Sequence, residues 1–216
     1  AMQVMDLDEL KRSGALWQGR RNTVATERVL PSGWPVLDEL LGGGWPRAAL
    51  AEVLGADHQG LPLLLPLLAS LSRGGRWLVW VAPPYVPYAP ALAARGLRVD
   101  RLLLIRDLSA GQRLWVAEQA LKSAACSAVL VWPDQARTAQ LRRLQLAAEQ
   151  GNCPVVLFRP SHAAAQGSPA ALRLRVRPAP SGLEVEVLKR RAAWGGGICI
   201  VPLQWGVAPG PDSAQD

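Results

Sequence analysis

The centre of the chain alternates short, predominantly apolar runs with longer segments of helical pattern. Strands are predicted at residues 49–54, 77–82, 102–106, 128–132 and 155–159. Strands that are nearly continuous apolar runs and alternate with helices are typical of a parallel sheet whose two faces are both covered. The expected fold class is therefore α/β, with a mainly parallel sheet flanked by helices.

The segments between these strands have the composition and periodicity of helices. Helices are predicted at 61–72, 89–95, 109–123 and 138–150, and a short one at 37–41 ends in the glycine run 42–44. Segment 61–72 is apolar nearly all round, which is typical of a buried helix.

The pattern changes after residue 168, where strands are predicted at 172–177, 183–188 and 198–202. In the first of them, leucine and valine alternate with Arg173, Arg175 and Arg177. Such alternation indicates antiparallel strands with one solvated face.

A chain of 216 residues, 50% of them hydrophobic, can bury one large core, which is assigned to residues 29–203. Residues 1–28 are expected to form an N-terminal helix and a basic linker, and residues 204–216 a disordered tail. The three cysteines, Cys126, Cys153 and Cys199, lie far apart in apolar stretches without metal-binding spacing. They are expected to be buried, reduced thiols, and no metal is expected.

Several segments resemble known proteins in order and spacing. The stretch LPSGWPVLDELLGGGWPRAALAEVLGADHQG (30–60) resembles the run that precedes the phosphate loop of RecA-like ATPases, and EQALKSAACSAVLVW (118–132) resembles their Walker B segment. More narrowly, GRWLVWVAPPYVPYAPALAARGL, RRLQLAAEQG and SPAALRLRV resemble the ImuA family of bacterial DNA-damage-inducible proteins, some of which are labelled SulA-like. The resemblance covers about residues 30–202 and implies a RecA-like core.

The phosphate loop of this core is expected to be degenerate. A working loop needs glycines whose backbone cradles phosphate, a lysine and a hydroxyl. Gly55 and Gly60 are in place, but Leu61 and Pro62 replace the lysine and the hydroxyl.

Two further catalytic groups are missing by the same comparison. The resemblance places the family's catalytic glutamate at Pro84 and its Walker B aspartate at Trp132. The chain is therefore expected to bind no cofactor and to be no enzyme, and an active RecA-like ATPase is disfavoured.

The resemblance implies a non-catalytic accessory protein of SOS-induced translesion DNA synthesis. As an adaptor it would bind ImuB and RecA, and through them an error-prone DNA polymerase. The alternative is a SulA-type cell-division inhibitor that binds the tubulin-like protein FtsZ. The expected location is the cytoplasm, near the nucleoid during DNA damage. No membrane span is expected, because the longest apolar run, 61–71, is short and contains two prolines.

Two surfaces are candidates for binding. Leu7, Leu10, Leu16 and Trp17 could form an apolar knob for RecA or another partner, or could pack on the chain's own core. The net charge of +7 permits sequence-independent binding of nucleic-acid phosphates, and a solvated sheet face is the open alternative. The candidate DNA-binding residues are Arg137, Arg142, Arg143, Arg173, Arg175, Arg177, Lys189, Arg190 and Arg191.

Overall fold

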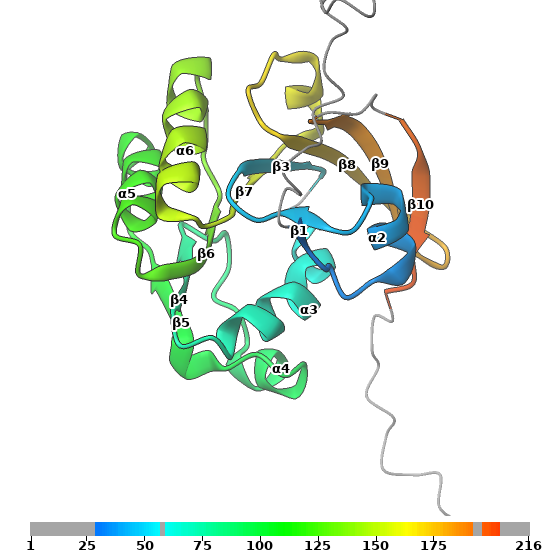
Figure 1. The fold of residues 1–216 in the computed structure, drawn as a ribbon, viewed down its shortest axis with the longest axis horizontal. Coiled ribbons are helices and arrows are strands. Elements are labelled where there is room, and N and C mark those ends of the chain that lie inside the picture. Colours follow the sequence, from blue (N-terminus) through cyan, green and yellow to red (C-terminus); the bar gives the residue numbers. More distant parts are fainter. Residues whose placement is uncertain (1–28, 57–58, 192–195, 204–216) are drawn as a thin grey trace, which may run out of the picture.

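The computed structural model of the protein describes residues 29–56, 59–191 and 196–203. Most of its strands belong to one twisted sheet (Figure 1). The strands of this sheet are β3 (Leu50–Leu54), β4 (Trp77–Val81), β5 (Leu102–Ile105), β6 (Cys126–Val131), β7 (Val155–Arg159), β8 (Leu172–Ala179), β9 (Gly182–Arg190) and β10 (Ile198–Val201). The expectation of an α/β fold with a mainly parallel sheet is confirmed.

The order of the strands across the sheet is β10-β9-β8-β3-β7-β6-β4-β5. The strands from β8 to β5 run parallel to their neighbours, whereas β9 and β10 are antiparallel. Strand β3, which precedes the expected phosphate loop, therefore lies in the middle of the sheet between β7 and β8.

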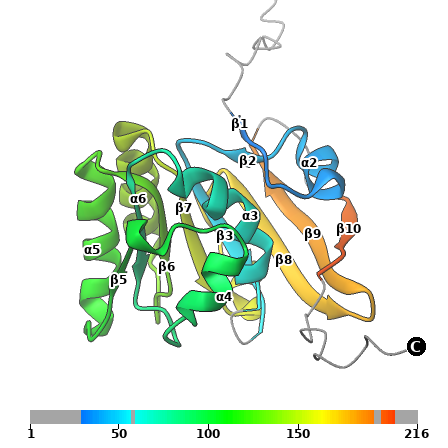
Figure 2. The ribbon, with the colours of Figure 1, turned by 90° about the horizontal axis from the view of Figure 1, so that it is seen from below.

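Helices cover both faces of the parallel part. They are α2 (Pro35–Leu41), α3 (Leu61–Ser72), α4 (Ala89–Ala94), α5 (Ala110–Lys122) and α6 (Thr138–Gly151). Helices α2, α3 and α4 pack on one face, and α5 and α6 pack side by side on the other (Figures 1 and 2). Alternate residues of each strand enter the two cores, so that Trp80 faces α3 while Val79 and Val81 face α5.

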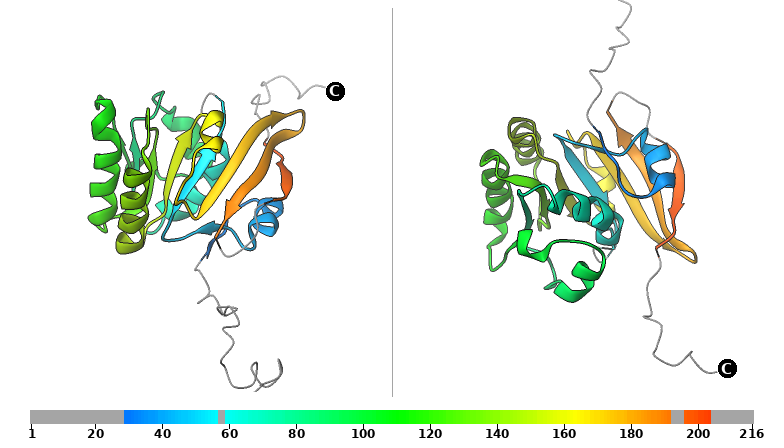
Figure 3. Two further views of the ribbon diagram at one scale, coloured as in Figure 1. Left: turned by 90° about the horizontal axis from the view of Figure 1, so that it is seen from above. Right: turned by 60° about the horizontal axis from the view of Figure 1, so that its bottom comes forward.

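The first described residues form a small ribbon and a helix at one end of the large sheet. A two-stranded ribbon pairs β1 (Val29–Leu30) with β2 (Trp45–Pro46), and α2 lies between them in sequence. Helix α2 packs against β10, although more than 150 residues separate them in the chain (Figure 3). The N-terminal and C-terminal parts of the described chain therefore pack against each other.

The arginine-bearing strand β8 corrects two expectations. It pairs in parallel with β3 on one side and is antiparallel only to β9 on the other. Its alternation also does not mark one solvated face, because Arg173 is buried at 7% exposure. A short 3-10 helix, η2 (Ser161–Ala165), supplies backbone acceptors for Arg173.

The three cysteines are free and buried, as expected. Leu7, Leu10, Leu16 and Trp17, the segments 1–28 and 204–216, and His58 in the phosphate-loop segment lie outside the described residues. In the part of the chain that is described, no helix is long and apolar enough to cross a bilayer.

Candidate functional site

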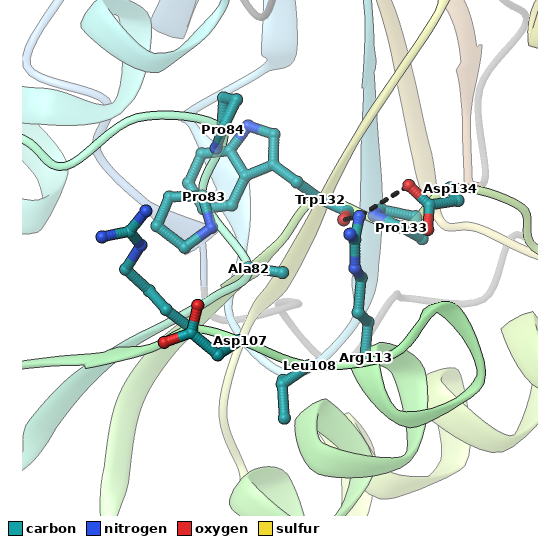
Figure 4. A pocket seen from close by; sticks show the side chains of 10 residues that line it. Ala82, Pro83, Pro84, Asp107, Leu108, Arg113, Trp132, Pro133 and Asp134 are labelled. Atoms are coloured by element: carbon teal, nitrogen blue, oxygen red, sulfur yellow. Dashed lines mark hydrogen bonds and ion pairs between the residues drawn. The ribbon is translucent and has the colours of Figure 1, made fainter.

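A crevice of about 410 Å³ opens at the carboxyl ends of β4, β5 and β6 (Figure 4). Its walls are the segments that follow these three strands, residues 82–84, 106–108 and 132–134, together with Arg113 of α5. The chain leaves β4 towards α4 on one face and leaves β6 towards α6 on the other. Neighbouring parallel strands with divergent connections create the crevice in which α/β proteins bind ligands.

The polar side of the crevice is organised by Arg113. Its Nη1 donates to the carboxylate of Asp134 at 2.7 Å and to the carbonyl oxygen of Trp132 at 3.1 Å. Figure 4 shows Arg113 reaching from α5 across to Asp134, which follows β6. These bonds fasten the start of α5 to the end of β6 and fix one wall of the crevice.

Two residues at the rim hold a strained backbone. Ala82 has φ of 53° and Asp107 has φ of 56°, in the left-handed region that costs an L-residue about 1 kcal/mol or more. The amide of Ala82 donates to the carbonyl of Ile105 at 2.8 Å, so the ladder between β4 and β5 continues into the strained turn. Strain of this kind concentrates at functional sites, which favours the crevice as one.

The apolar side of the crevice continues into an exposed aromatic loop. Pro83 and Pro84 line the crevice, and Tyr85, Val86 and Tyr88 follow directly. Their exposures are 76%, 59% and 73%, and the two tyrosines are the only ones in the chain. Prolines within and around the loop restrict its backbone, so the aromatic side chains are presented at little entropic cost.

The segment expected to be a phosphate loop connects β3 to α3, as the RecA resemblance implies. Gly60 precedes the first helical residue, Leu61, and a Cβ at Gly60 would lie 2.3 Å from Val53 Cγ1. A Cβ at Gly55 would lie 2.6 Å from Val176 Cγ2. Close packing against β3 and β8 therefore requires both glycines, whether or not a phosphate is bound.

A buried ionic cluster lies beside this segment, on the α6 side of the sheet. Glu52, fully buried in β3, accepts a bond from Arg159 Nη1 at 2.7 Å and another from Arg173 Nε. Arg173 also donates to the carbonyl of Ala163 at 2.8 Å, and Arg159 to Gln166 at 2.6 Å. The cluster joins three neighbouring strands to η2. Because the guanidinium of Arg173 is buried and bonded within this cluster, it is not presented to a phosphate.

The other candidate DNA-binding residues do not form one patch. Arg175 and Arg177 pair with Glu186 and Glu184 of β9, at 3.1 Å and 2.8 Å. The two glutamates offset the charge that these two arginines could offer to phosphates.

The remaining residues of this set lie on α6 and on or just after β9. Arg143 pairs with Glu118 at 2.7 Å, Lys189 donates to Ser168 O at 2.8 Å, Arg190 donates to Leu40 O at 3.3 Å, and Arg191 pairs with Glu149 at 3.7 Å. Burial, followed by the nearby Arg173, lowers the pKa of Lys189. Arg137 and Arg142 are the N-cap and an exposed residue of α6.

The sequence analysis missed the crevice and the aromatic loop. The walls of the crevice, residues 82–84, 106–108 and 132–134, belong to segments that meet only when the strand order is known. The loop did carry a local signal, because both tyrosines stand within a short stretch that also holds four prolines, 83, 84, 87 and 90. Exposed tyrosines on a stiff loop are typical of protein-binding surfaces.

Comparison with known proteins gives one family description. The family model "Cell division inhibitor SulA" matches residues 50–154. The SulA protein of Edwardsiella piscicida is 36% identical over 107 residues, 49% of this chain and 64% of that protein. The SulA protein of Yersinia pestis (strain Pestoides F) is 32% identical over 129 residues, 59% of this chain and 77% of that protein. The chain thus spans just under two thirds of the Edwardsiella protein and somewhat more of the Yersinia one.

Two solved structures are also similar. The RadB recombinase has a TM-score of 0.63 at 20% identity, over 79% of this chain and 94% of that one, and this likeness shows a RecA-like fold. The crystal structure of SulA from Pseudomonas aeruginosa has a TM-score of 0.45 at 29% identity, over 52% of this chain and 98% of that one.

These findings correct the expected function and partners. The adaptor of translesion synthesis that binds ImuB and RecA is contradicted, because the relatives that share the core are named cell division inhibitors. The narrower ImuA resemblance is not confirmed, and the alternative reading is the one that the relatives favour. By its identity to proteins of which it covers as much as 77%, the chain belongs to the SulA family.

Proposed function

We propose that this protein is a cell-division inhibitor that binds FtsZ, and that it acts by binding rather than by catalysis. The observation that carries the proposal is the loop bearing Tyr85, Val86 and Tyr88 at the carboxyl edge of the sheet. Large exposed apolar side chains that lie together mark protein-binding surfaces, and tyrosine is among the residues that contribute most to such interfaces. Membership of the SulA family supports a division protein as the partner.

The residues where the RecA resemblance places a nucleotide site support the non-catalytic part of the proposal. Leu61 and Pro62 stand at the start of α3, where an ATPase needs a lysine and a hydroxyl, so we infer a degenerate P-loop. Pro84 and Trp132 stand where the resemblance places the glutamate and the Walker B aspartate. Leucine, proline and tryptophan carry no group that could bind magnesium or activate water.

Titration of purified FtsZ with this protein tests the proposal. Wild type is expected to bind FtsZ by calorimetry and to reduce the amount of FtsZ polymer that sediments. The double variant Tyr85→Ser with Tyr88→Ser is expected to lose at least about tenfold in affinity, since each buried aromatic anchor contributes about 1–2 kcal/mol or more. Leu146→Ser on α6 is the matched control, because Leu146 is also exposed, at 63%, but lies on another element.

Failure of wild type to bind FtsZ, or equal losses in the tyrosine and Leu146 variants, would contradict the proposal. The non-catalytic part is tested separately by incubating the protein with ATP and magnesium. Phosphate release above the buffer rate, lost on unfolding, would overturn it.

A further inference from the structure

The crevice beside the aromatic loop has one apolar side and one charged side, which carries two arginines and two aspartates. Pro83, Pro84 and Pro133 supply apolar wall, whereas Arg106 and Arg113 supply guanidinium groups. Within the described residues, Arg106 is exposed and makes no hydrogen bond or ion pair, and Arg113 uses only its Nη1. A planar guanidinium with an unused edge is suited to a carboxylate, which it can bind through two parallel bonds.

A buried donor without an acceptor also lies at the crevice. In the described part of the chain, Trp132 Nε1 and Arg113 Nε are buried and have no hydrogen-bond partner. Trp132 is 3% exposed and lines the crevice, and its ring lies beside Pro84 in Figure 4. Trp45 and Trp80 share this deficit, and Trp132 belongs to the same core cluster, with its ring stacked on Phe158 at 4.6 Å between centroids, so only the deficit at Arg113 Nε is specific to the crevice. Buried donors without acceptors are rare in folded proteins, so an acceptor-bearing ligand is favoured here.

Helix α5 adds to the positive potential of this side. Its first residue, Ala110, lies between Leu108 and Arg113, which both line the crevice. The first amides of a helix have no acceptors within it, and the helix dipole favours an anion near them. Two carboxylates oppose this potential, Asp134, which is engaged by Arg113 at 2.7 Å, and the exposed Asp107 next to Arg106 in the chain. The preference for an anion therefore rests on the side chain of Arg106, which is unpaired among the described residues, and not on net charge.

We propose that this crevice is a carboxylate-binding site that takes an acidic side chain of the partner docked on the Tyr85–Tyr88 loop. The identity of the partner that supplies this side chain rests on the proposed function. The preference for a carboxylate rests on the residues of the crevice alone. The carboxylate contacts Arg106 and the unused edge of Arg113, while the apolar part of the same segment packs on Pro83 and Pro84.

The first arm of the test uses the isolated protein and two short peptides, N-acetyl-Glu-Leu-Glu-amide and its neutral analogue N-acetyl-Gln-Leu-Gln-amide. Binding is followed by ¹⁵N–¹H NMR at the Trp132 indole signal, which is assigned by its absence in Trp132→Phe. The acidic peptide is expected to shift this signal saturably, with a Kd of about 1 mM or tighter, and the neutral peptide to bind at least about tenfold more weakly.

Variants locate the binding. Arg106→Gln is expected to weaken the acidic peptide at least about fivefold without changing the thermal midpoint, because Arg106 holds no other described residue. Arg113→Gln is expected to weaken binding of the acidic peptide further. The thermal midpoint of this variant is also measured, because Arg113 forms an ion pair with Asp134. Arg142→Gln, at an exposed arginine of α6, is the matched control and is expected to bind as wild type does.

The second arm measures FtsZ affinity for wild type and Arg106→Gln at low and high salt. A weaker complex with a smaller salt dependence in Arg106→Gln supports the inference. Equal binding of the two peptides, or no saturable shift with either, overturns it even if FtsZ binds. Binding of the acidic peptide by a protein that ignores FtsZ supports the crevice chemistry and removes the proposed function instead.

Discussion

Replacing Glu52 with glutamine would leave two buried guanidinium groups without a counter-ion. Glu52 is fully buried, and the side chains of Arg159 and Arg173 are only 6% and 8% exposed. The substitution keeps the shape of the side chain and one acceptor oxygen, but it removes the negative charge that both arginines share. It therefore isolates the ionic contribution from packing.

The expected loss follows from the burial of the cluster. Removing one partner of a buried ion pair costs about 3–5 kcal/mol, because the remaining charge stays desolvated. Since glutamine retains an acceptor, the lower end of that range, about 3 kcal/mol, is expected. For a domain of this size 1 kcal/mol corresponds to about 2–4 °C in Tm, so the Tm should fall by about 6–12 °C.

Thermal unfolding followed by circular dichroism measures this change. The control is Glu184→Gln on the half-exposed face of the same sheet, where Glu184 pairs with Arg177 at 2.8 Å. The side chains of this pair are 30% and 52% exposed, so the control should lose no more than about 1 kcal/mol. If Glu52→Gln unfolds within about 2 °C of the control, the cluster does not stabilise the fold as argued.

Three further predictions concern a titrating carboxylate, a strained turn and a buried thiol. Burial opposes ionisation of Glu118, but bonds from Lys122 and Arg143 outweigh it and lower its pKa. The stabilisation is therefore present above the ordinary pKa of 4.5 and is lost as pH falls through the lowered value. Urea unfolding should show a smaller acid loss for Glu118→Gln than for wild type, and parallel losses would refute this. Ala82→Gly should raise the free energy of unfolding by about 0.5 kcal/mol, because relief of the left-handed φ of 53° outweighs the added chain entropy; a lower urea midpoint would argue against strain. Burial raises the pKa of Cys153 to about 12, so Ellman's reagent should label it only after denaturant is added, and rapid labelling of the native protein would show that the thiol is accessible.

Local pattern was sufficient to locate most elements. The predominantly apolar runs became β3, β4, β6 and β7, because a strand buried on both faces favours apolar side chains, and the charged residues in these runs, Glu52 and Arg159, are buried as an ion pair. Strand β5 has the same composition but lies at the sheet edge, with Leu103 46% exposed. Composition cannot separate an edge strand from a central one when both are apolar, so its position was not predictable.

The arginines of β8 show where pattern fails for a physical reason. An alternating strand is read as half solvated, but Arg173 faces Glu52, which lies 121 residues earlier in the chain. Nothing near either residue indicates the pairing, since it depends on β3 and β8 becoming neighbours. The same holds for the crevice, whose three walls come from separate turns.

The sequence by itself determined the α/β class and the helices on both faces of the sheet, because each depends on local composition and periodicity. Only the tertiary structure decided which strands are neighbours. It thereby buried one arginine of a charged strand, paired the others, and gathered Arg106, Arg113 and the tyrosine loop at one edge of the sheet. Strand order arises from long-range packing of faces that are alike in sequence, and for that reason the surface proposed for function became visible only in the fold.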